Sequence, residues 1–323
     1  MGVYHLMGLG RSPGAVTGPL SYLGYRYQHW NANDQNFFSR SGETSQRKSD
    51  KKVGDVQSLV LFTTPEILTG ELNSYDFVDN PPGRVTKHQL QIGGEMKTIL
   101  PCLLKAVWPE VSGGRNKGSI FWCEIDRRNI LTTYERIVQV VASLAGVGRQ
   151  GKEVWANLTG GNNVTNFALE LAATLSGDIA RLYYVQAENS DSEKCVHFTA
   201  REGYWVDLPV MPLKLSSINI AVLDLLGTEN SLSLEELHNR LSGHENCWNQ
   251  MQGVSSEDFR KVYLKPMWKQ GLLAESEKKY VIGPQWHLIK PYEKILQTSR
   301  NTGRTIEELT QQENWIEREQ IDL

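Results

Sequence analysis

The feature of this sequence that most constrains its fold is a repeated change of hydrophobic period along its first two thirds. Short apolar runs, each ending at a turn residue, lie at 3–9, 58–62, 119–125 and 154–158. The segments 130–144 and 164–176 instead repeat apolar side chains at helical spacing. Alternating strands and helices favour an open, mostly parallel sheet with helices on both faces, so we expect a Rossmann-like α/β fold.

Local patterns predict further elements in the same region. Helices are expected over 19–30 and over 96–108, although Pro101 interrupts the second. A last pair of strands is expected at 179–185 and 195–199. Residues 31–54 are polar and charged, which predicts a loop or an insertion.

The pattern changes after the prolines at 209 and 212, which mark a domain boundary. Three helices and a hairpin are expected, at 218–226, 233–241, 255–271 and 272–281. This order is typical of a winged helix, whose core we expect to contain Trp248, Trp268 and Trp286. A further amphipathic helix is expected over 305–318. The predicted domains are therefore 1–211, a winged helix at 212–290 and a helical tail at 291–323.

Composition excludes several classes of function. The formal net charge is −3, whereas proteins that bind long polyanions normally present a basic surface. The four cysteines form no CxxC pair and the seven histidines show no ligand spacing, so we expect reduced cysteines, no metal and no cofactor. No apolar stretch approaches the roughly 18 residues of a membrane helix. We expect a cytoplasmic protein with no membrane partner.

Candidate binding residues follow the strands, because ligands of open parallel sheets bind beyond the carboxyl ends of the strands. They are Gly10, Arg11, Ser12, Pro13, Thr64, Arg127, Arg128, Thr159, Gly160, Gly161, Asn162 and Asn163. Glycine lets the backbone approach a ligand, helix N-terminal amides attract anions, and arginine binds phosphate in a bidentate manner. The loops at 10–14 and 159–163 therefore predict a phosphate site. The alternative is that their glycines only shape tight turns.

Better-known glycine motifs do not fit these loops. Neither loop has the Gly-Lys-Ser/Thr element of a P-loop, and Pro13 breaks the dinucleotide fingerprint. The segment 10–14 matches Gly-x-Ser-x-Gly, but no later histidine is clearly placed to serve a hydrolase nucleophile.

Two motifs carry a family resemblance. Residues 9–17 read Leu-Gly-Arg-Ser-Pro-Gly-Ala-Val-Thr, which resembles the first motif of CARF domains, especially of the ring-nuclease branch. Residues 157–163 read Asn-Leu-Thr-Gly-Gly-Asn-Asn, which resembles the second CARF motif, Asp/Asn-x-Thr-Gly-Gly-Thr-Lys. The resemblance covers about 1–210, and some CARF domains are followed by a winged helix.

The resemblance implies a role in type III CRISPR systems, with cyclic oligoadenylate, usually the four-adenosine ring, bound across a homodimer. It implies that Ser12 takes part in metal-independent cleavage of that ring, which would end the signal. The family lysine of the second motif falls on Asn163, which carries no charge. Arg11, Arg127 or Arg128 is then expected to supply the missing cation.

The alternative is a transcription regulator that senses the ring without cleaving it. The winged helix favours this function, and its third predicted helix carries Arg260, Lys261, Lys265 and Lys269. Against it, residues 212–323 hold 13 Lys and Arg but 16 Asp and Glu. DNA is therefore a doubtful partner.

Overall fold

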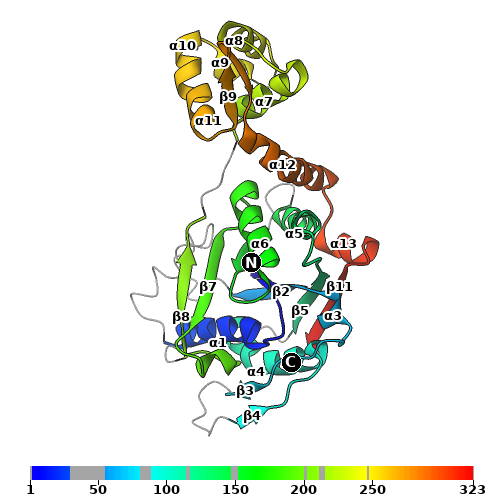
Figure 1. Cartoon of the computed structure of the whole chain (residues 1–323). Coiled ribbons are helices and arrows are strands. Elements are labelled where there is room, and N and C mark those ends of the chain that lie inside the picture. Colours follow the sequence, from blue (N-terminus) through cyan, green and yellow to red (C-terminus); the bar gives the residue numbers. More distant parts are fainter. Residues whose placement is uncertain are drawn as a thin grey trace. The chain divides into compact units, whose positions relative to one another are not determined.

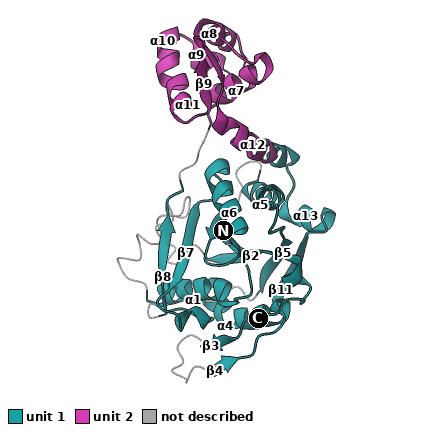
Figure 2. Ribbon diagram, viewed as in Figure 1, with its two compact units in different colours: residues 1–212, 296–323 teal, residues 213–295 magenta. Residues whose placement is uncertain are grey.

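The structure, a computed structural model of the whole chain, forms two compact units (Figures 1 and 2). It describes residues 2–29, 55–80, 89–113, 117–146, 152–199, 202–210, 215–245 and 247–322. Unit 1 contains Met1–Pro212 and Leu296–Leu323, and unit 2 is Leu213–Ile295. The predicted insertion at 31–54 lies outside the described residues.

Unit 1 is built on a seven-stranded, mostly parallel sheet with the order β11-β5-β2-β1-β6-β7-β8. The parallel strands are β1 (Val3–Gly8), β2 (Val56–Thr63), β5 (Lys117–Glu124), β6 (Glu153–Asn157) and β7 (Arg181–Ala187). The edge strands β8 (Gly203–Leu208) and β11 (Ile316–Asp322) run antiparallel to their neighbours. The expected open α/β sheet is thus confirmed.

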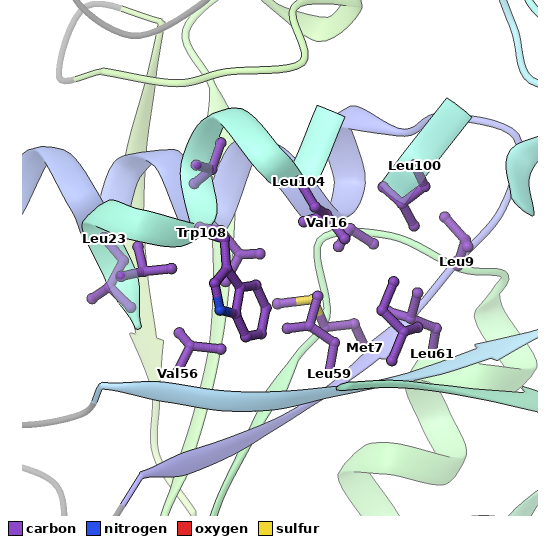
Figure 3. Close-up of a cluster of buried hydrophobic side chains, with 14 of the residues drawn as sticks. Met7, Leu9, Val16, Leu23, Val56, Leu59, Leu61, Leu100, Leu104 and Trp108 are labelled. Atoms are coloured by element: carbon purple, nitrogen blue, oxygen red, sulfur yellow. The ribbon is translucent and has the colours of Figure 1, made fainter. Parts of the chain in front are cut away.

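Helices cover both faces of this sheet, which explains why its central strands are apolar throughout. The helices α1 (Gly14–Gln28) and α4 (Met96–Val111) lie on one face, and α5 (Ile130–Ala145) and α6 (Asn163–Ser176) on the other (Figure 1). The main core fills the space between the first pair of helices and the sheet (Figure 3). Met7, Leu59, Leu61, Leu104 and Trp108 are fully buried there.

The helix α4 continues through Pro101 and a second proline, Pro109. A proline inside a helix costs about 3 kcal/mol. Several apolar side chains of α4 pack into the main core, including Leu100, Leu104 and Trp108, and this burial offsets the cost.

The last pair of strands differs from the prediction. The segment 195–199 is not a strand; β7 pairs with β8 instead, with Val185 opposite Trp205. Residues 195–198 run along α1 at close range, because a Cβ on Gly14 would come 2.4 Å from the Cys195 carbonyl oxygen. Their apolar side chains serve this packing rather than a ladder of strand hydrogen bonds.

The C-terminal segment is also different from the predicted helical tail. The helix α12 (Pro284–Thr302) is followed by α13 (Ile306–Gln312), and the chain then forms β11. The expected helix over 305–318 ends at Gln312 because β11 pairs with the edge of β5 and buries Trp315, Ile316 and Ile321.

Small elements complete unit 1 near the carboxyl ends of the strands. They are the short helix α3 (Pro65–Leu68), the hairpin of β3 (Phe77–Asp79) and β4 (Gln89–Gln91), and a 3₁₀ turn, η2 (Ser192–Lys194). Among the described helices, none has the length and apolarity that crossing a membrane requires.

Unit 2 consists of helices and one antiparallel hairpin. The helices are α7 (Ser217–Glu229), α8 (Leu234–Ser242), α9 (Trp248–Met251), α10 (Ser256–Phe259) and α11 (Lys265–Lys269), followed by the start of α12. A π-helical turn, Arg260–Leu264, joins α10 to α11, and β9 (Leu273–Ser276) pairs with β10 (Lys279–Ile282). That these elements form a winged helix remains a prediction.

One expectation about the core of unit 2 is wrong in part. Trp286 is buried with Phe259, Leu264 and Met267. Trp248 and Trp268, however, are 54% and 52% exposed. Aliphatic and aromatic side chains from α7, α8 and α10–α12 fill the core of unit 2 without these two tryptophans.

Candidate functional site

The two glycine loops meet at the point where the strand order reverses. The strand β1 lies between β2 and β6, and the chain continues outward from β1 in both directions. This order leaves a crevice beyond the carboxyl ends of β1 and β6. A Cβ on Gly8 would lie 2.8 Å from the Gly160 carbonyl oxygen, and a Cβ on Gly160 would lie 2.4 Å from Ala15 Cβ. Gly161 has a φ of +84°, in the left-handed region. These glycines allow direct backbone contact between the loops.

Asn157, at the end of β6, fixes this contact. Its buried side-chain oxygen accepts hydrogen bonds from Thr159 N (2.8 Å) and Thr159 Oγ1 (2.6 Å). Its Nδ2 donates to the Ala15 carbonyl at 3.3 Å. Thr159 Oγ1 also accepts from Val185 N at 2.8 Å. The Thr159 hydroxyl therefore holds the loop in place with both its donor and its acceptor capacity.

A cavity of about 400 Å³ lies at this junction, and we call it the loop cavity. Its lining includes the predicted residues Gly10, Arg11, Ser12, Thr159, Gly160 and Gly161. Four of its other residues form an apolar wall: Ala15, Val185, Ala187 and Phe198. The remaining lining residues are Gly14, Tyr75 and Glu193.

Arg11 is held in place while part of its guanidinium stays available. Its Nε donates to the Asn73 carbonyl at 2.7 Å, and its Cζ lies 4.1 Å from the centre of the Tyr75 ring. The Tyr75 amide in turn donates to the Arg11 carbonyl at 2.8 Å. Within the described ranges, neither terminal nitrogen of Arg11 nor the hydroxyl of Ser12 has a hydrogen-bond partner. Three donor groups are thus free on one side of the loop cavity.

Pro13, Asn162 and Asn163 serve the helix starts and do not line the cavity. The Pro13 carbonyl accepts from the amides of Val16 and Thr17, and Pro13 caps α1. The Asn162 side chain caps α6 by accepting from Thr165 N at 2.9 Å. Asn163 is the first, exposed residue of α6. The loops point both helix N-termini toward the end of the sheet where anions are favoured.

The other predicted residues, Thr64, Arg127 and Arg128, line a different cavity of about 400 Å³, the arginine cavity. The reason is the strand order: Arg127 follows β5, which β2 separates from β1. Two strand spacings amount to about 10 Å. Arg127 and Arg128 share the sheet edge with the loops, as expected, but they do not line the loop cavity. Arg11 is the described cation that does.

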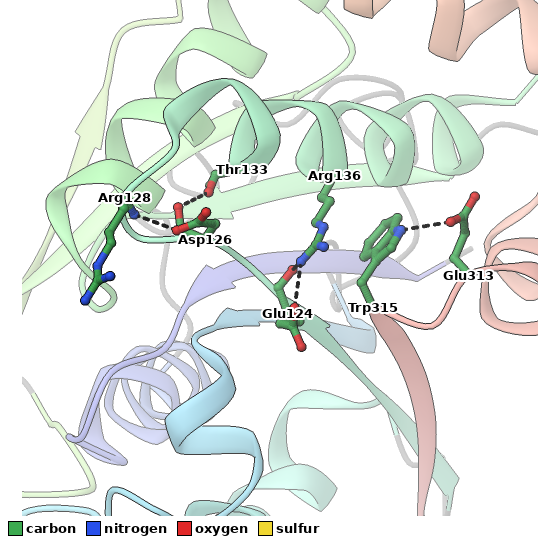
Figure 4. A network of polar contacts seen from close by, with 7 residues as sticks. All are labelled: Glu124, Asp126, Arg128, Thr133, Arg136, Glu313 and Trp315. Carbon is green, nitrogen blue, oxygen red and sulfur yellow. Dashed lines mark hydrogen bonds and ion pairs between the residues drawn. The ribbon is translucent and has the colours of Figure 1, made fainter.

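Glu66, Glu124 and Asp126 also line the arginine cavity. Figure 4 shows Glu124 bonded to Arg136, and Asp126 accepting from the Arg128 amide. Arg127 lies 3.4 Å from Glu66, and Arg136 donates to the carbonyl and the carboxylate of Glu124 at 2.6 and 3.2 Å. A hydrogen bond from Thr64, together with its own amide and the nearby arginines, lowers the pKa of Glu66. The carboxylates offset the arginines, so this cavity is a weaker anion site than its three arginines alone imply.

The buried His5 of β1 is not a candidate base. Its Nδ1 contacts the Tyr183 hydroxyl at 2.8 Å, and its Nε2 is buried without a hydrogen-bond partner among the described residues. Burial, with a smaller effect of Arg181, lowers the pKa of His5 to about 3. Among the described residues, no group of three or more His, Cys, Asp or Glu side chains could hold a metal ion.

Sequence reasoning missed the cavity residues Tyr75, Val185, Ala187, Glu193 and Phe198, and it assigned no structural role to Asn157. Asn157 had a usable signal, because a polar residue ending an apolar strand must be hydrogen-bonded. The others come from segments distant in sequence, and no local pattern places them at the loops.

No protein-family profile matches the chain. An uncharacterized protein of Archaeoglobus fulgidus is 26% identical over 267 residues, which cover 76% of this chain and 79% of that protein. Most of the chain therefore has a distant archaeal counterpart.

Proposed function

We propose that the protein binds cyclic oligoadenylate, the four-adenosine ring in particular, in the loop cavity and cleaves it without a metal. The ring would lie across the two-fold axis of a homodimer, and its loss would end type III CRISPR signalling. One observation carries the proposal: the loop cavity brings together the open backbone at Gly10, the free Ser12 hydroxyl and the free nitrogens of Arg11.

This combination suits a phosphodiester. A Cβ built on Gly10 meets no atom of the described residues within 4 Å, so this part of the chain leaves room beside Gly10. The guanidinium of Arg11 matches phosphate oxygens in geometry and charge. The motifs that resemble CARF domains supply the identity of the ligand, and a symmetric ring fits an isologous dimer that offers each loop twice.

In the proposed reaction, a ribose 2′-oxygen attacks the adjacent phosphorus while the 5′-oxygen leaves. The P–O2′ bond forms as the P–O5′ bond breaks, and the proton of the 2′-hydroxyl passes to solvent as the leaving oxygen gains one. The product is a linear chain with a 2′,3′-cyclic phosphate. Ser12 would orient the 2′-hydroxyl or the phosphate, and Arg11 would stabilise the charge on the phosphoryl oxygens.

The test is to incubate the purified protein with labelled cyclic tetra-adenylate in EDTA and to separate the products. We expect linear products with a 2′,3′-cyclic phosphate end. Ser12→Ala should slow cleavage about a hundredfold, as is usual when one stabilising donor is lost. Ser190→Ala is the matched control, because Ser190 is exposed and does not line the loop cavity. A ring that stays intact for hours with excess protein would contradict cleavage.

A second candidate is a regulator that binds the ring without cleaving it and acts through unit 2. A separate cavity of about 360 Å³ in unit 2 favours it. Arg260, Lys261 and Lys265 line this cavity together with the exposed Trp268. Cations beside an exposed aromatic ring are typical of nucleic-acid contacts. Tight binding of an intact ring in the same experiment would favour this candidate.

A further inference from the structure

Glu193 is the one acidic residue among the described residues that line the loop cavity. Its carboxylate has no hydrogen bond or ion pair within the described part of the chain. A carboxylate only accepts hydrogen bonds, and it repels a phosphate nearby. A site for phosphate alone would bind more tightly without it.

The turn that carries Glu193 is firmly built. The side-chain oxygen of Asn189 accepts from the amides of Asp191 and Ser192, both at 3.0 Å. The next residues pack against α1, where the Cys195 carbonyl oxygen approaches Gly14. The backbone at Glu193 is therefore fixed at the cavity rather than free to swing away with a loose loop.

The apolar wall gives the cavity a second character. The partly exposed Ala187 lines the same cavity as Glu193, and Val185 and Phe198 contribute only their small exposed edges of 2% and 4%. A phosphate makes no use of such a surface, whereas the flat face of a nucleobase does. Val185 and Ala187 lie at the end of β7, and Phe198 follows Glu193 in the segment along α1. The donor groups Arg11 and Ser12 come from the loop after β1 instead.

We infer that Glu193 selects the base of the ligand by accepting a hydrogen bond from the exocyclic 6-amino group of adenine. The phosphate then lies against Arg11 and Ser12, and the base lies against the apolar wall. This inference rests on the proposed function, because it assigns the base specificity of that same site. The amino group supplies the donor that the carboxylate needs, and the hydrogen bond offsets the repulsion between Glu193 and the phosphate.

The experiment is a double-mutant cycle between protein and ligand. Binding of two cyclic tetranucleotides, one with adenine and one with unsubstituted purine, is measured by fluorescence titration before products accumulate. The wild-type protein should bind the adenine ring at least about tenfold more tightly, since hydrogen bonds to charged groups are strong. Glu193→Ala should weaken binding of the adenine ring and strengthen binding of the purine ring. The preference for adenine over purine should then fall to less than about twofold.

Glu188→Ala is the matched control. It removes the same charge from an exposed residue five positions earlier that does not line the cavity, and it should keep the wild-type preference. If Glu193→Ala strengthens binding of both rings equally, the inference is wrong, because Glu193 would then act only as a charge that repels the ligand.

A third ring, with 2′-deoxyadenosine, tests the competing contact. If Glu193→Ala abolishes discrimination against this ring and leaves the preference for adenine over purine intact, the carboxylate faces the ribose and the inference is wrong. If the wild-type protein binds none of the rings, the proposed function itself fails. If the wild-type protein binds all three rings without preferring adenine, the inference about Glu193 is wrong, whereas the proposed function still stands.

Discussion

At the scale of single residues, the glycines of the two loops separate into two kinds. Gly8, Gly160 and Gly161 touch other backbone atoms so closely that a side chain cannot fit. Gly10 has open space on its side-chain face and no positive φ. The sequence shows four equivalent glycines, whereas the structure assigns three to loop packing and leaves the side-chain face of Gly10 open.

This difference predicts opposite results for two alanine substitutions. Gly10→Ala should leave the free energy of unfolding within about 0.5 kcal/mol of wild type, because the new methyl group meets no protein atom. It should weaken binding of the ring, since the methyl group occupies the cavity. Urea unfolding and ligand titration measure the two effects.

Gly8→Ala is the contrasting variant. Its methyl group would press on the Gly160 carbonyl oxygen at 2.8 Å, so it should cost about 1–3 kcal/mol of stability. If Gly10→Ala destabilises the protein as much as Gly8→Ala, or binds the ring as tightly as wild type, then Gly10 has no role toward a ligand.

Residue chemistry also explains how far the sequence could predict the site. The strand ends and glycines identified the loops, because those signals are local. Thr159 and Asn162 were expected to contact the ligand, but their side-chain oxygens already bond Val185, Asn157 and Thr165. Glu193 and Tyr75 reach the cavity only through tertiary packing, which one sequence does not reveal.

At the scale of elements, the strands buried on both faces were predictable, whereas the edges of the sheet were not. The runs at 3–9 and 154–158 are almost entirely apolar, and they form β1 and β6. The strand β11 alternates buried and exposed residues only in part, so its pattern does not clearly predict a strand. The helix start capped by Thr305 just before it favours predicting a longer helix instead. The position of β11 depends on the unpaired edge of β5, which is a distant partner in sequence.

The strand β11 should therefore contribute measurably to the stability of unit 1. Ile321 is 2% exposed and belongs to the main core, so Ile321→Ala should lower the free energy of unfolding by about 2–4 kcal/mol. Gln320→Ala changes the exposed neighbour in the same strand and should have an effect below about 0.5 kcal/mol. Urea unfolding followed by tryptophan fluorescence measures both. Equal stability of the two variants would contradict the packing of β11 in the core.

At the scale of the whole molecule, the two units have separate hydrophobic cores, so the charge of each can be considered by itself. Unit 2 carries ten Lys and Arg and ten Asp and Glu, so it has no net charge to attract a polyanion. The cations near Trp268 are a local feature. We therefore expect any nucleic-acid binding by unit 2 to act over a short range.

A gel shift with the full chain tests whether unit 2 contacts nucleic acid. If it does, Lys265→Glu should weaken binding of a labelled oligonucleotide about tenfold and reduce its salt dependence. Lys290→Glu makes the same charge change on an exposed residue of α12 outside the cavity, and it should have little effect. Binding that neither substitution changes would exclude this surface as the contact.

The pairing of β11 with β5 also has a consequence for synthesis on the ribosome. Residues 125–315 separate β5 from β11, so the outer edge of β5 has no strand partner until β11 has been synthesised. At about 5–20 residues per second, that interval is on the order of ten seconds. During this time unit 2 can fold as a unit, while the nascent sheet of unit 1 keeps an open edge that can pair wrongly. The strand β11 thus closes this edge only after unit 2 has been synthesised.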